Sequence, residues 1–557
     1  MKPRIHNFWR HLPTRKIAKV ATIIVVLQTV YLLTMHNELM DLFSGDEDFP
    51  TMRPINHTFE DMDSVKYIQD LVNGKAEVAP VVEPEKYPEI YLGCSMEETR
   101  NVSRGWITNG RWFLYSAYED RRANSLYPKL KTVIQVIAST FYVVDDSERW
   151  YCHIRNSDGE MLRVRAHFRL IWQRAWDARR TFYNPYLITC ALPNDFTIYK
   201  GATVMLRGKK CPNGNDTFID VNLVSKAREM ERHKRYMAAK PVEIGENGRK
   251  IGKILETMAR NRYDRVKLED KQAALNEDEA KISIKQIDIA PSPLKIAVCV
   301  KGMDFFEDKT YDLTEWLLFQ FKLGADSVTL YVYHLPERTL RMLNEVAREY
   351  DLRLIHLDLP GNTTLSDHQQ HDYIWNNHYQ KRRNELIPYN DCFYAYSHTH
   401  DYVLIVDTDE IVVPVEEENW NDMISKFIRG FRQNATSLSA RNVFKFPRKG
   451  DGVGMSGRRT RASIAQDKGV TGKSFISTQT AATVFNHFAL HRLHGNVART
   501  AYFPTSAALK LHYKTDCPTD FRDECDRLKN SSIPDHSLDR WSEEVAEQAK
   551  EFIKRVD

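Results

Sequence analysis

Residues 295–333 read KIAVCVKGMDFFEDKTYDLTEWLLFQFKLGADSVTLYVY, and this stretch decides the fold class. An apolar β-branched run is followed by a segment with helical spacing and then by a second apolar run. The alternation continues through a helical segment (337–350) to apolar runs at 352–358 and 402–407. Strands that alternate with helices at this spacing are typical of a parallel sheet with helices on its faces. We therefore predict an α/β domain over residues 291–557.

The fourth expected strand leads directly into three carboxylates. Residues 401–414, DYVLIVDTDEIVVP, place Asp407, Asp409 and Glu410 immediately after an apolar run. Ligands of parallel sheets bind beyond the carboxyl ends of the strands, and buried carboxylates need a compensating cation or hydrogen-bond donors. A few carboxylates together with phosphate oxygens suit Mg²⁺ or Mn²⁺. We predict that Asp407 and Asp409 bind such an ion; an exposed acidic turn is the simpler alternative.

The chain upstream of this domain divides by composition. Residues 89–225 alternate polar with β-branched or aromatic residues between turn-like segments, which predicts a mostly β, sandwich-like domain. Residues 226–290 are charged with helical spacing and predict a connector of surface helices. A nucleic-acid patch is the alternative reading of this connector, but acidic residues are interleaved throughout it.

The N-terminal 88 residues have the pattern of a membrane anchor with a stem. Residues 17–36 are mostly apolar and approach the roughly 20 residues needed to cross a bilayer. Basic residues precede this run and acidic residues follow it, which places residues 1–16 in the cytoplasm and the remainder across the membrane. Residues 37–88 are acidic and dotted with proline, as in a stem. A cleaved signal peptide is the alternative, but no small-x-small cleavage pattern follows the run.

Charge and cysteine content narrow the class of protein. Because 79 basic residues nearly balance 75 acidic ones, a dedicated nucleic-acid-binding protein is disfavoured. Four of the eight cysteines lie in each half of the chain, and the sequence contains no Cys-x-x-Cys pair of the kind that binds zinc. We expect disulfides in an oxidising lumen, with Cys299 as a possible exception because it lies in an expected buried strand. N-glycosylation triplets that permit the same location begin at Asn56, Asn101, Asn215, Asn362, Asn434 and Asn530.

Several short segments resemble glycosyltransferase family 92, the nematode and plant β-1,4-galactosyltransferase family. LIVDTDEIVVP resembles its D-x-D-E segment, and Asn390-Asp391-Cys392 resembles an Asp-Cys pair on the preceding helix. TGKSFI (471–476) followed by VFNHFALH resembles a lysine-containing strand and a histidine segment, which gives Lys473 and His491. LHYK (511–514) resembles a C-terminal His-Tyr-basic motif, and residues 114–122 resemble an N-terminal β region. The resemblance covers residues 293–545, and 110–220 more loosely.

The resemblance implies a GT-A-like, Rossmann-type catalytic domain. It further implies a UDP-sugar donor, UDP-galactose in particular, a glycan acceptor, Mn²⁺ dependence and inversion at the anomeric carbon. Since GT-A enzymes often supply an imidazole from their C-terminal region, His512 becomes the third expected metal ligand beside Asp407 and Asp409. A packed strand histidine is the alternative. One departure is the sequence STQT (477–480), where relatives have an Arg-Pro after the lysine strand.

The sequence does not decide which residues contact the substrate or which residue acts as the catalytic base. Lys473, His491, His378 and Arg382 are candidates for donor or acceptor binding, although packing would also explain several of them. An inverting transfer needs a base within hydrogen-bond reach of the acceptor hydroxyl. The candidates are Glu410, next to the metal pair, and Asp451 and Asp467, in a glycine- and arginine-rich segment that resembles a flexible loop.

The expected function is therefore a metal-dependent galactosyltransferase of the Golgi lumen, anchored as a single-pass type II membrane protein. One alternative keeps the fold and changes the UDP-sugar. Another is a non-catalytic membrane protein whose β domain binds glycans. The presence of Asp407, Asp409 and His512 favours an enzyme over the second alternative.

Overall fold

The computed structural model describes residues 105–224 and 293–557, apart from gaps at 123–126, 128, 145–147, 173–181, 209–211, 213–215, 362–364, 431–434, 496 and 518–521. The predicted tail, membrane span 17–36, stem and helical connector lie outside these residues. Within the described ranges, no helix is long and apolar enough to span a bilayer.

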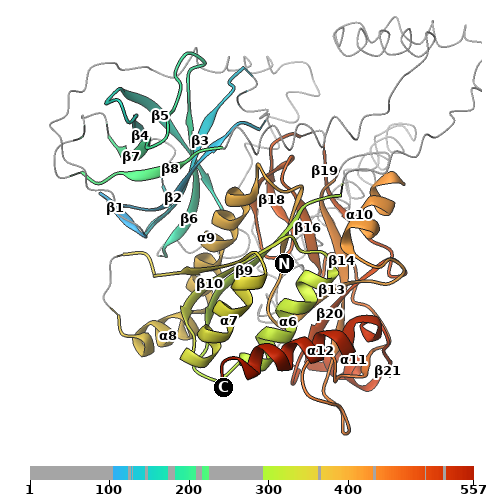
Figure 1. Ribbon diagram of the computed structural model, residues 1–557. Helices are drawn as coiled ribbons and strands as arrows, with labels where there is room; N and C mark the ends of the chain where they lie inside the picture. The colour runs from blue at the N-terminus through green and yellow to red at the C-terminus, as the bar shows by residue number, and fades with distance from the viewer. Residues whose placement is uncertain are drawn as a thin grey trace, which may run out of the picture. The chain divides into compact units, whose positions relative to one another are not determined.

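The first described part is all β (Figure 1). Its strands are β1 (Ile107–Asn109), β2 (Trp112–Asp120), β3 (Val133–Thr140), β4 (Tyr151–Arg155), β5 (Met161–Leu170), β6 (Asn184–Ala191), β7 (Thr203–Arg207) and β8 (Ile219–Asn222). Their order is β1-β2-β3-β6-β5-β4-β7-β8, and β8 pairs with β2 as well. The ladder thus closes on itself around a core that includes Trp112 and Val164. The predicted β domain has a closed sheet where a sandwich was expected, because alternation along strands does not reveal which strands pair.

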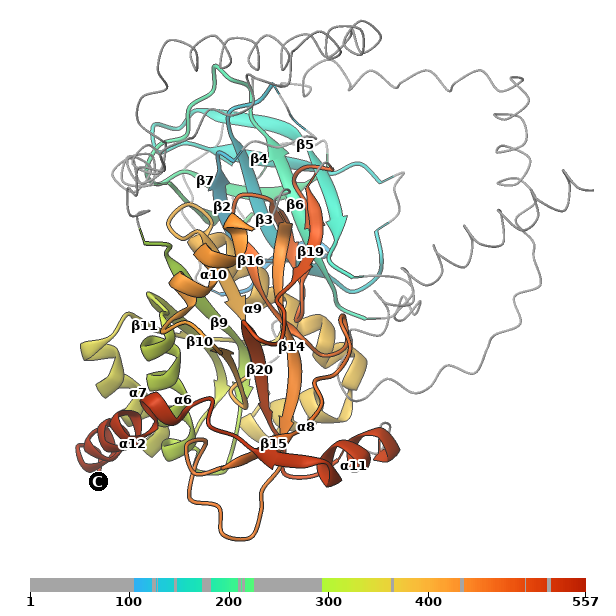
Figure 2. The same cartoon turned by 90° about the vertical axis from the view of Figure 1, so that its right-hand side faces the viewer.

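The second part is a mixed α/β domain built on one twisted sheet. Its strands are β9 (Ile296–Asp304), β10 (Ser327–His334), β11 (Leu352–His356), β12 (Tyr402–Ile405), β13 (Glu410–Pro414), β14 (Ala435–Lys445), β16 (Lys473–Ser477), β19 (Ala498–Tyr502) and β20 (Ala508–Tyr513). The order is β11-β10-β9-β12-β16-β14-β20-β13, with β19 beside β14. The four strands predicted as parallel are parallel, whereas β16 runs antiparallel to β12 and β13 antiparallel to β20. Figure 2 shows β14 and β20 side by side, next to the edge strand β13.

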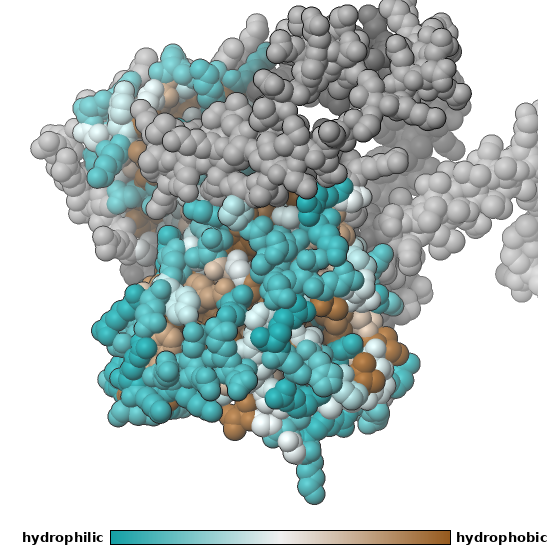
Figure 3. All heavy atoms as spheres, turned by 45° about the vertical axis from the view of Figure 1, so that its right-hand side comes forward, coloured by the Kyte–Doolittle hydropathy of each residue, from teal (hydrophilic) through white to brown (hydrophobic). Residues whose placement is uncertain are grey.

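Helices cover this sheet, and two short strand pairs form separate two-stranded sheets. The helices are α6 (Thr310–Leu323), α7 (Glu337–Glu349), α8 (Asp367–Asn376), α9 (His378–Tyr396), α10 (Trp420–Arg429), α11 (Arg522–Asn530) and α12 (Asp539–Lys554). The short pairs are β15 (Thr460–Ala462) with β21 (Ser532–Pro534), and β17 (Ala481–Val484) with β18 (Ala489–Arg492). On the face that Figure 3 shows, hydrophilic residues cover most of the described surface.

Helix α9 connects the two parts, which belong to one compact unit. Ala297 and Cys299 of β9 share a buried core with α9 and with Ile137 and Leu187 of the β domain. The Tyr118 hydroxyl of β2 also donates a 2.7 Å hydrogen bond to Asp391 of α9. Helix α6 packs against β10 and β13 and also contacts α7 and α12 (Figure 1).

Disulfides join Cys152 to Cys190, Cys299 to Cys392 and Cys517 to Cys525. The expectation that Cys299 might be unpaired is therefore wrong: its buried strand lies directly under Cys392 of α9. Cys94 and Cys211 lie outside the described residues.

The Cys299–Cys392 bond should contribute strongly to stability. It joins residues 93 apart in sequence, and cross-links that close long loops constrain the unfolded chain most. Replacing both cysteines with alanine should cost about 2–4 kcal/mol in the free energy of unfolding. The matched control is removal of Cys517–Cys525, whose separation is 8, and its loss should be smaller. Denaturant unfolding of both double variants checks this order, and the reverse order would contradict it.

Candidate active site

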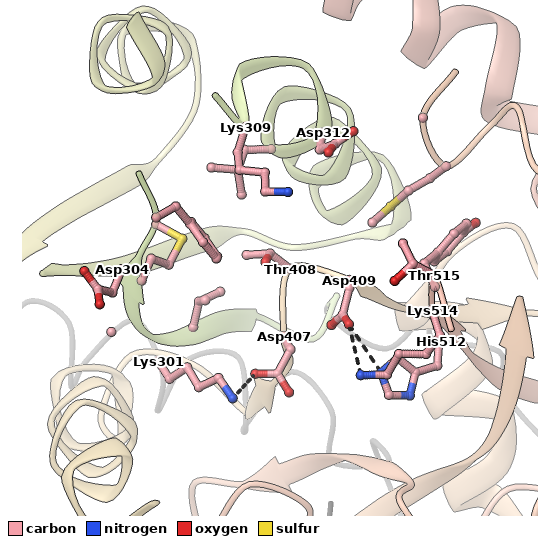
Figure 4. A pocket seen from close by; sticks show the side chains of 18 of the residues that line it. Lys301, Asp304, Lys309, Asp312, Asp407, Thr408, Asp409, His512, Lys514 and Thr515 are labelled. Atoms are coloured by element: carbon pink, nitrogen blue, oxygen red, sulfur yellow. Dashed lines mark ion pairs between the residues drawn. The ribbon is translucent and has the colours of Figure 1, made fainter. Parts of the chain in front are cut away.

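A cavity of about 680 Å³ opens beyond the carboxyl ends of β9 and β12 (Figure 4). Five segments of the chain contribute to its lining: the end of β9 with the residues that follow it (within 300–313), parts of α8 and α9, the turn 407–409, the loop 447–458, and residues 512–515. This is the edge at which the sequence placed a ligand, and strand order explains why. Because β9 and β12 are parallel neighbours, both strands end at the same edge of the sheet.

The turn after β12 separates the two predicted metal ligands. The Asp407 carboxylate turns toward lysines: its Oδ1 lies 3.2 Å from Lys301 Nζ, and its Oδ2 accepts from Lys473 Nζ at 2.9 Å. The Asp409 carboxylate turns the other way, with Oδ2 3.4 Å from His512 Nε2 and 3.6 Å from Lys514 Nζ. Figure 4 shows these two carboxylates facing different partners across Thr408.

Glu410 lies beneath the turn, fully buried. Its Oε1 accepts from Lys510 Nζ at 2.6 Å, and its Oε2 lies 3.2 Å from Lys473 Nζ. Burial alone raises the pKa of Glu410, but the charges of these two lysines outweigh it, so the net pKa is lowered. The side chain is not among those that line the cavity. A buried carboxylate held between two ammonium groups cannot reach an acceptor hydroxyl, so Glu410 does not fit the predicted role of base.

The register of β13 against β20 creates the candidate metal group. Glu410 is paired with His512, so the last residues of the acidic turn meet the C-terminal imidazole. Asp409, Glu410 and His512 each offer one donor atom, and these atoms lie within 4.8 Å of one another. Asp407, a predicted ligand, is not part of this group. Carboxylate and imidazole donors suit Mn²⁺.

Lysines compensate the acidic turn from several sides. Lys301, Lys473, Lys510 and Lys514 all lie within 3.6 Å of a carboxylate oxygen of Asp407, Asp409 or Glu410. Burial raises the pKa of Asp409, but His512 and Lys514 outweigh this effect and lower the net pKa to about 2. Lys301 also lies 3.2 Å from Glu385, so these four ammonium groups face four carboxylates. The lysines therefore balance the carboxylates, and two of them, Lys301 and Lys514, line the cavity, where a cation suits an anionic ligand.

The loop 447–458 reaches the cavity because Glu315 of α6 holds it. The buried Glu315 carboxylate accepts hydrogen bonds from the backbone N–H groups of Met455 (2.5 Å) and Ser456 (3.2 Å). Gly454 has φ +74°, and a Cβ there would collide with Glu315. The arrangement fixes Asp451 and Arg458 at the cavity wall.

The predicted substrate-binding residues divide into two groups. His378 and Arg382 line the cavity, as do Trp375 and the candidate base Asp451. Arg382 Nε donates to His378 Nε2 at 2.9 Å, so the two act as a pair on α9. Lys473 lies beneath the cavity floor, in contact with Asp407.

Two predicted residues lie elsewhere. His491 is in the β17–β18 hairpin, where its Nδ1 lies 2.6 Å from Thr483 Oγ1, and burial together with Arg169 and Arg499 lowers its pKa to about 3. The Asp467 side chain is 89% exposed beside Arg441. Neither residue lines the cavity. Both assignments came from linear proximity to a motif, which does not determine the direction of a hairpin or a loop.

The Asn390-Asp391-Cys392 segment has a structural place in this fold. Asn390 exchanges hydrogen bonds with the backbone of Val484, while Asp391 accepts from Tyr118 and Tyr331, and burial raises its pKa. The departure at 477–480 also lies away from the cavity lining: the Thr478 carbonyl accepts from Arg122 of the β domain at 2.7 Å. That departure therefore does not alter the cavity.

Sequence reasoning missed residues at the carboxyl end of β9 and just beyond it. Lys301, Asp304 and Lys309 all line the cavity. Their signal was available, because KGMD directly follows the first expected apolar run, 295–300, at the same edge of the sheet as Asp407. Lys510 had no such signal: it is one lysine in an alternating strand.

Fold and cavity together define an α/β domain that gathers carboxylates, an imidazole and cations at the carboxyl ends of parallel strands. Residues 295–549, which make up most of this α/β domain, match the model of Glycosyltransferase family 92. Comparison with curated protein sequences gave no match.

Among solved structures, S. aureus TarS 1-349 in complex with UDP is 14% identical, with a TM-score of 0.22, over 42% of this chain and 64% of that one. A second structure of S. aureus TarS 1-349 is 14% identical, with a TM-score of 0.21, over 41% of this chain and 62% of that one. The chain thus spans less than two thirds of either structure, and likenesses this weak support no functional conclusion.

Proposed function

We propose that the protein is a metal-dependent, inverting glycosyltransferase that transfers galactose from UDP-galactose to a glycan acceptor. The observation that carries the proposal is the juxtaposition of Asp409 with His512 and Lys514 in the cavity of the domain that matches family 92. This wall offers carboxylate and imidazole donors to a cation and an ammonium group to a phosphate.

The cavity's own residues suit a nucleotide diphosphate. Lys301, Lys514 and Arg458 line it and would attract and orient the two phosphates. Asp409 and His512 would hold the metal, while the oxygens of Glu410 are shared with Lys473 and Lys510. When bound, the ion would act as a Lewis acid on the leaving diphosphate. Because lysines already compensate the carboxylates, we expect the ion to bind far more tightly with UDP than alone.

Asp451 is the candidate base that we retain, because of the three candidates it alone lines the cavity. Its carboxylate accepts hydrogen bonds from the backbone N–H groups of Arg448 (2.7 Å) and Arg459 (3.4 Å). These donors hold the side chain at the wall, where an acceptor hydroxyl could reach it.

We also propose a single-pass type II location in the Golgi membrane, with the catalytic domain in the lumen. The disulfides of both described parts support an oxidising compartment, and residues 17–36 supply an apolar run for the anchor. Protease digestion of sealed microsomes should spare everything beyond about residue 40, the distance of one bilayer span from the tail. Digestion without detergent would contradict this topology.

Release of UDP measures the proposed reaction directly. The purified protein should release UDP from UDP-galactose in the presence of a mixed glycan acceptor and Mn²⁺, and chelation should stop it. UDP-glucose and UDP-N-acetylglucosamine serve as competing donors. Faster release from one of these would change the donor sugar and keep the enzyme class. Glycan binding with no release from any donor would instead favour the non-catalytic alternative.

A further inference from the structure

Asp304, the last residue of β9, is a buried carboxylate at the cavity wall. Its Oδ2 accepts from the indole N–H of Trp375 at 3.2 Å and lies 2.8 Å from His371 Nδ1. Its Oδ1 is buried as well, and among the described residues no hydrogen-bond partner reaches it. One oxygen is therefore held in place by two side chains of α8, while the other keeps its full capacity to accept.

An unpaired buried carboxylate oxygen is costly. Leaving a buried acceptor unsatisfied costs about 1–3 kcal/mol, and more when the group is charged. Native proteins keep such groups where a ligand or water satisfies them. The ligand that Oδ1 fits is a hydrogen-bond donor, because an ionised carboxylate only accepts.

Trp375 adds an apolar surface beside this acceptor. The side chain lines the cavity and is 50% exposed, although large aromatic side chains are ordinarily buried. Lys381 Nζ lies 3.5 Å from the ring centroid, which fixes the orientation of the indole. An aromatic face next to a fixed carboxylate matches a sugar ring, whose C–H groups pack on the aromatic face while a hydroxyl donates to the carboxylate.

The surroundings hold α8 rigidly. Ser366 and Gln369 form a reciprocal capping box at its N-terminus. Phe306 stacks on His368 (4.6 Å between centroids) and on His334 (4.3 Å), which ties the helix to the ends of β9 and β10. His371 and Trp375 are therefore positioned before any ligand arrives, as a binding subsite requires.

We propose that Asp304, His371 and Trp375 form a subsite for a hydroxylated sugar ring, with Asp304 Oδ1 accepting from a ring hydroxyl. Figure 4 places Asp304 on the opposite side of Lys301 and Asp407 from Asp409 and His512. The ring bound here is thus distinct from the group held at the metal wall. The inference rests on the proposed function only in the source of that ring, which is the donor's ribose or an acceptor sugar.

Direct binding of small probes tests the subsite without turnover. The probes are uridine and the methyl β-glycosides of galactose, glucose and N-acetylglucosamine, followed by saturation-transfer NMR on the purified full chain. Asp304→Asn and Trp375→Ala should each weaken one class of probe by roughly 10-fold, the effect of losing one charge-assisted hydrogen bond or one ring contact. Tyr199→Ala is the matched control: Tyr199 is equally exposed, at 50%, but does not line the cavity.

The class of probe affected identifies the source of the ring. Weaker uridine binding assigns the subsite to ribose, and weaker glycoside binding assigns it to the acceptor. Trp375 is half exposed, so we expect Trp375→Ala to fold. The subsite is overturned if this variant binds every probe as the wild type does. It is also overturned if the wild-type protein binds no probe. Ring binding that depends on Asp304 in a protein that releases no UDP would sink the proposed function and leave the subsite intact.

Discussion

Replacing Lys473 with methionine should lower the free energy of unfolding by about 3–5 kcal/mol, the range for removing one partner of a buried ion pair. Lys473 is fully buried, and its ammonium group lies between Asp407 Oδ2 at 2.9 Å and Glu410 Oε2 at 3.2 Å. Methionine keeps the length of the stem and removes the charge. Asp407 and Glu410 then lose the partner that they share, and each keeps one other lysine: Lys301 beside Asp407 and Lys510 beside Glu410.

Acid should reduce this loss. Because the folded-state pKa of Glu410 is lowered, its contribution to stability is present above the unfolded value of about 4.3 and disappears as pH falls through the folded value. The gap between wild type and Lys473→Met should therefore be widest near neutral pH and narrow below about pH 4. Urea unfolding at both pH values measures it.

Lys426→Met is the control for this experiment. Lys426 also pairs with two carboxylates, Glu416 and Glu417, but its side chain is 58% exposed. Exposed ion pairs contribute little to stability because solvent and salt screen them. Equal losses in the two variants, or a gap for Lys473→Met that does not change with pH, would show that the buried lysine does not stabilise the turn through its charge.

The parallel strands and the acidic turn were predictable because each depends on local pattern. The apolar run 402–405 forms a strand that is buried from its second residue on, and the residues after such a strand lie at the edge where parallel strands end. The meeting of Asp409 with His512 followed from the resemblance of two motifs about one hundred residues apart. Its physical cause, the pairing of β13 with β20, was not readable from either segment.

The partners of the carboxylates could not be predicted, for a related reason. Lys301, Lys473 and Lys510 come from three different strands, and only strand order brings them to one turn. Lys473 was expected to contact substrate, yet it lies below Asp407 because β16 runs antiparallel to β12. A strand's pattern tells which residues are buried; which neighbour each one meets depends on pairings made across the whole domain.

Asp409→Asn should reduce metal-dependent UDP release by roughly 10²–10³-fold, the usual cost of losing one group that stabilises developing charge. His512 and Lys514 lower the pKa of Asp409 to about 2, so the carboxylate is ionised near neutral pH and supplies a negative charge to a bound cation. An asparagine of the same shape supplies none. Its side chain is 42% exposed, so we expect folding to tolerate the change. Steady-state rates and calorimetric UDP binding, each with and without Mn²⁺, measure the effect.

UDP binding without metal should survive in this variant, since Lys301 and Arg458 remain at the cavity wall. Asp467→Asn is the matched control, because it makes the same chemical change at a side chain that is 89% exposed and outside the cavity. Asp407→Asn should differ from both: it breaks the contacts to Lys301 and Lys473, so its loss should appear in stability as well as rate. A different result would reassign the metal ligand. If Mn²⁺ dependence persists in Asp409→Asn but disappears in Asp407→Asn, the metal is bound by Asp407, on the side of the turn that faces Lys301 and Lys473.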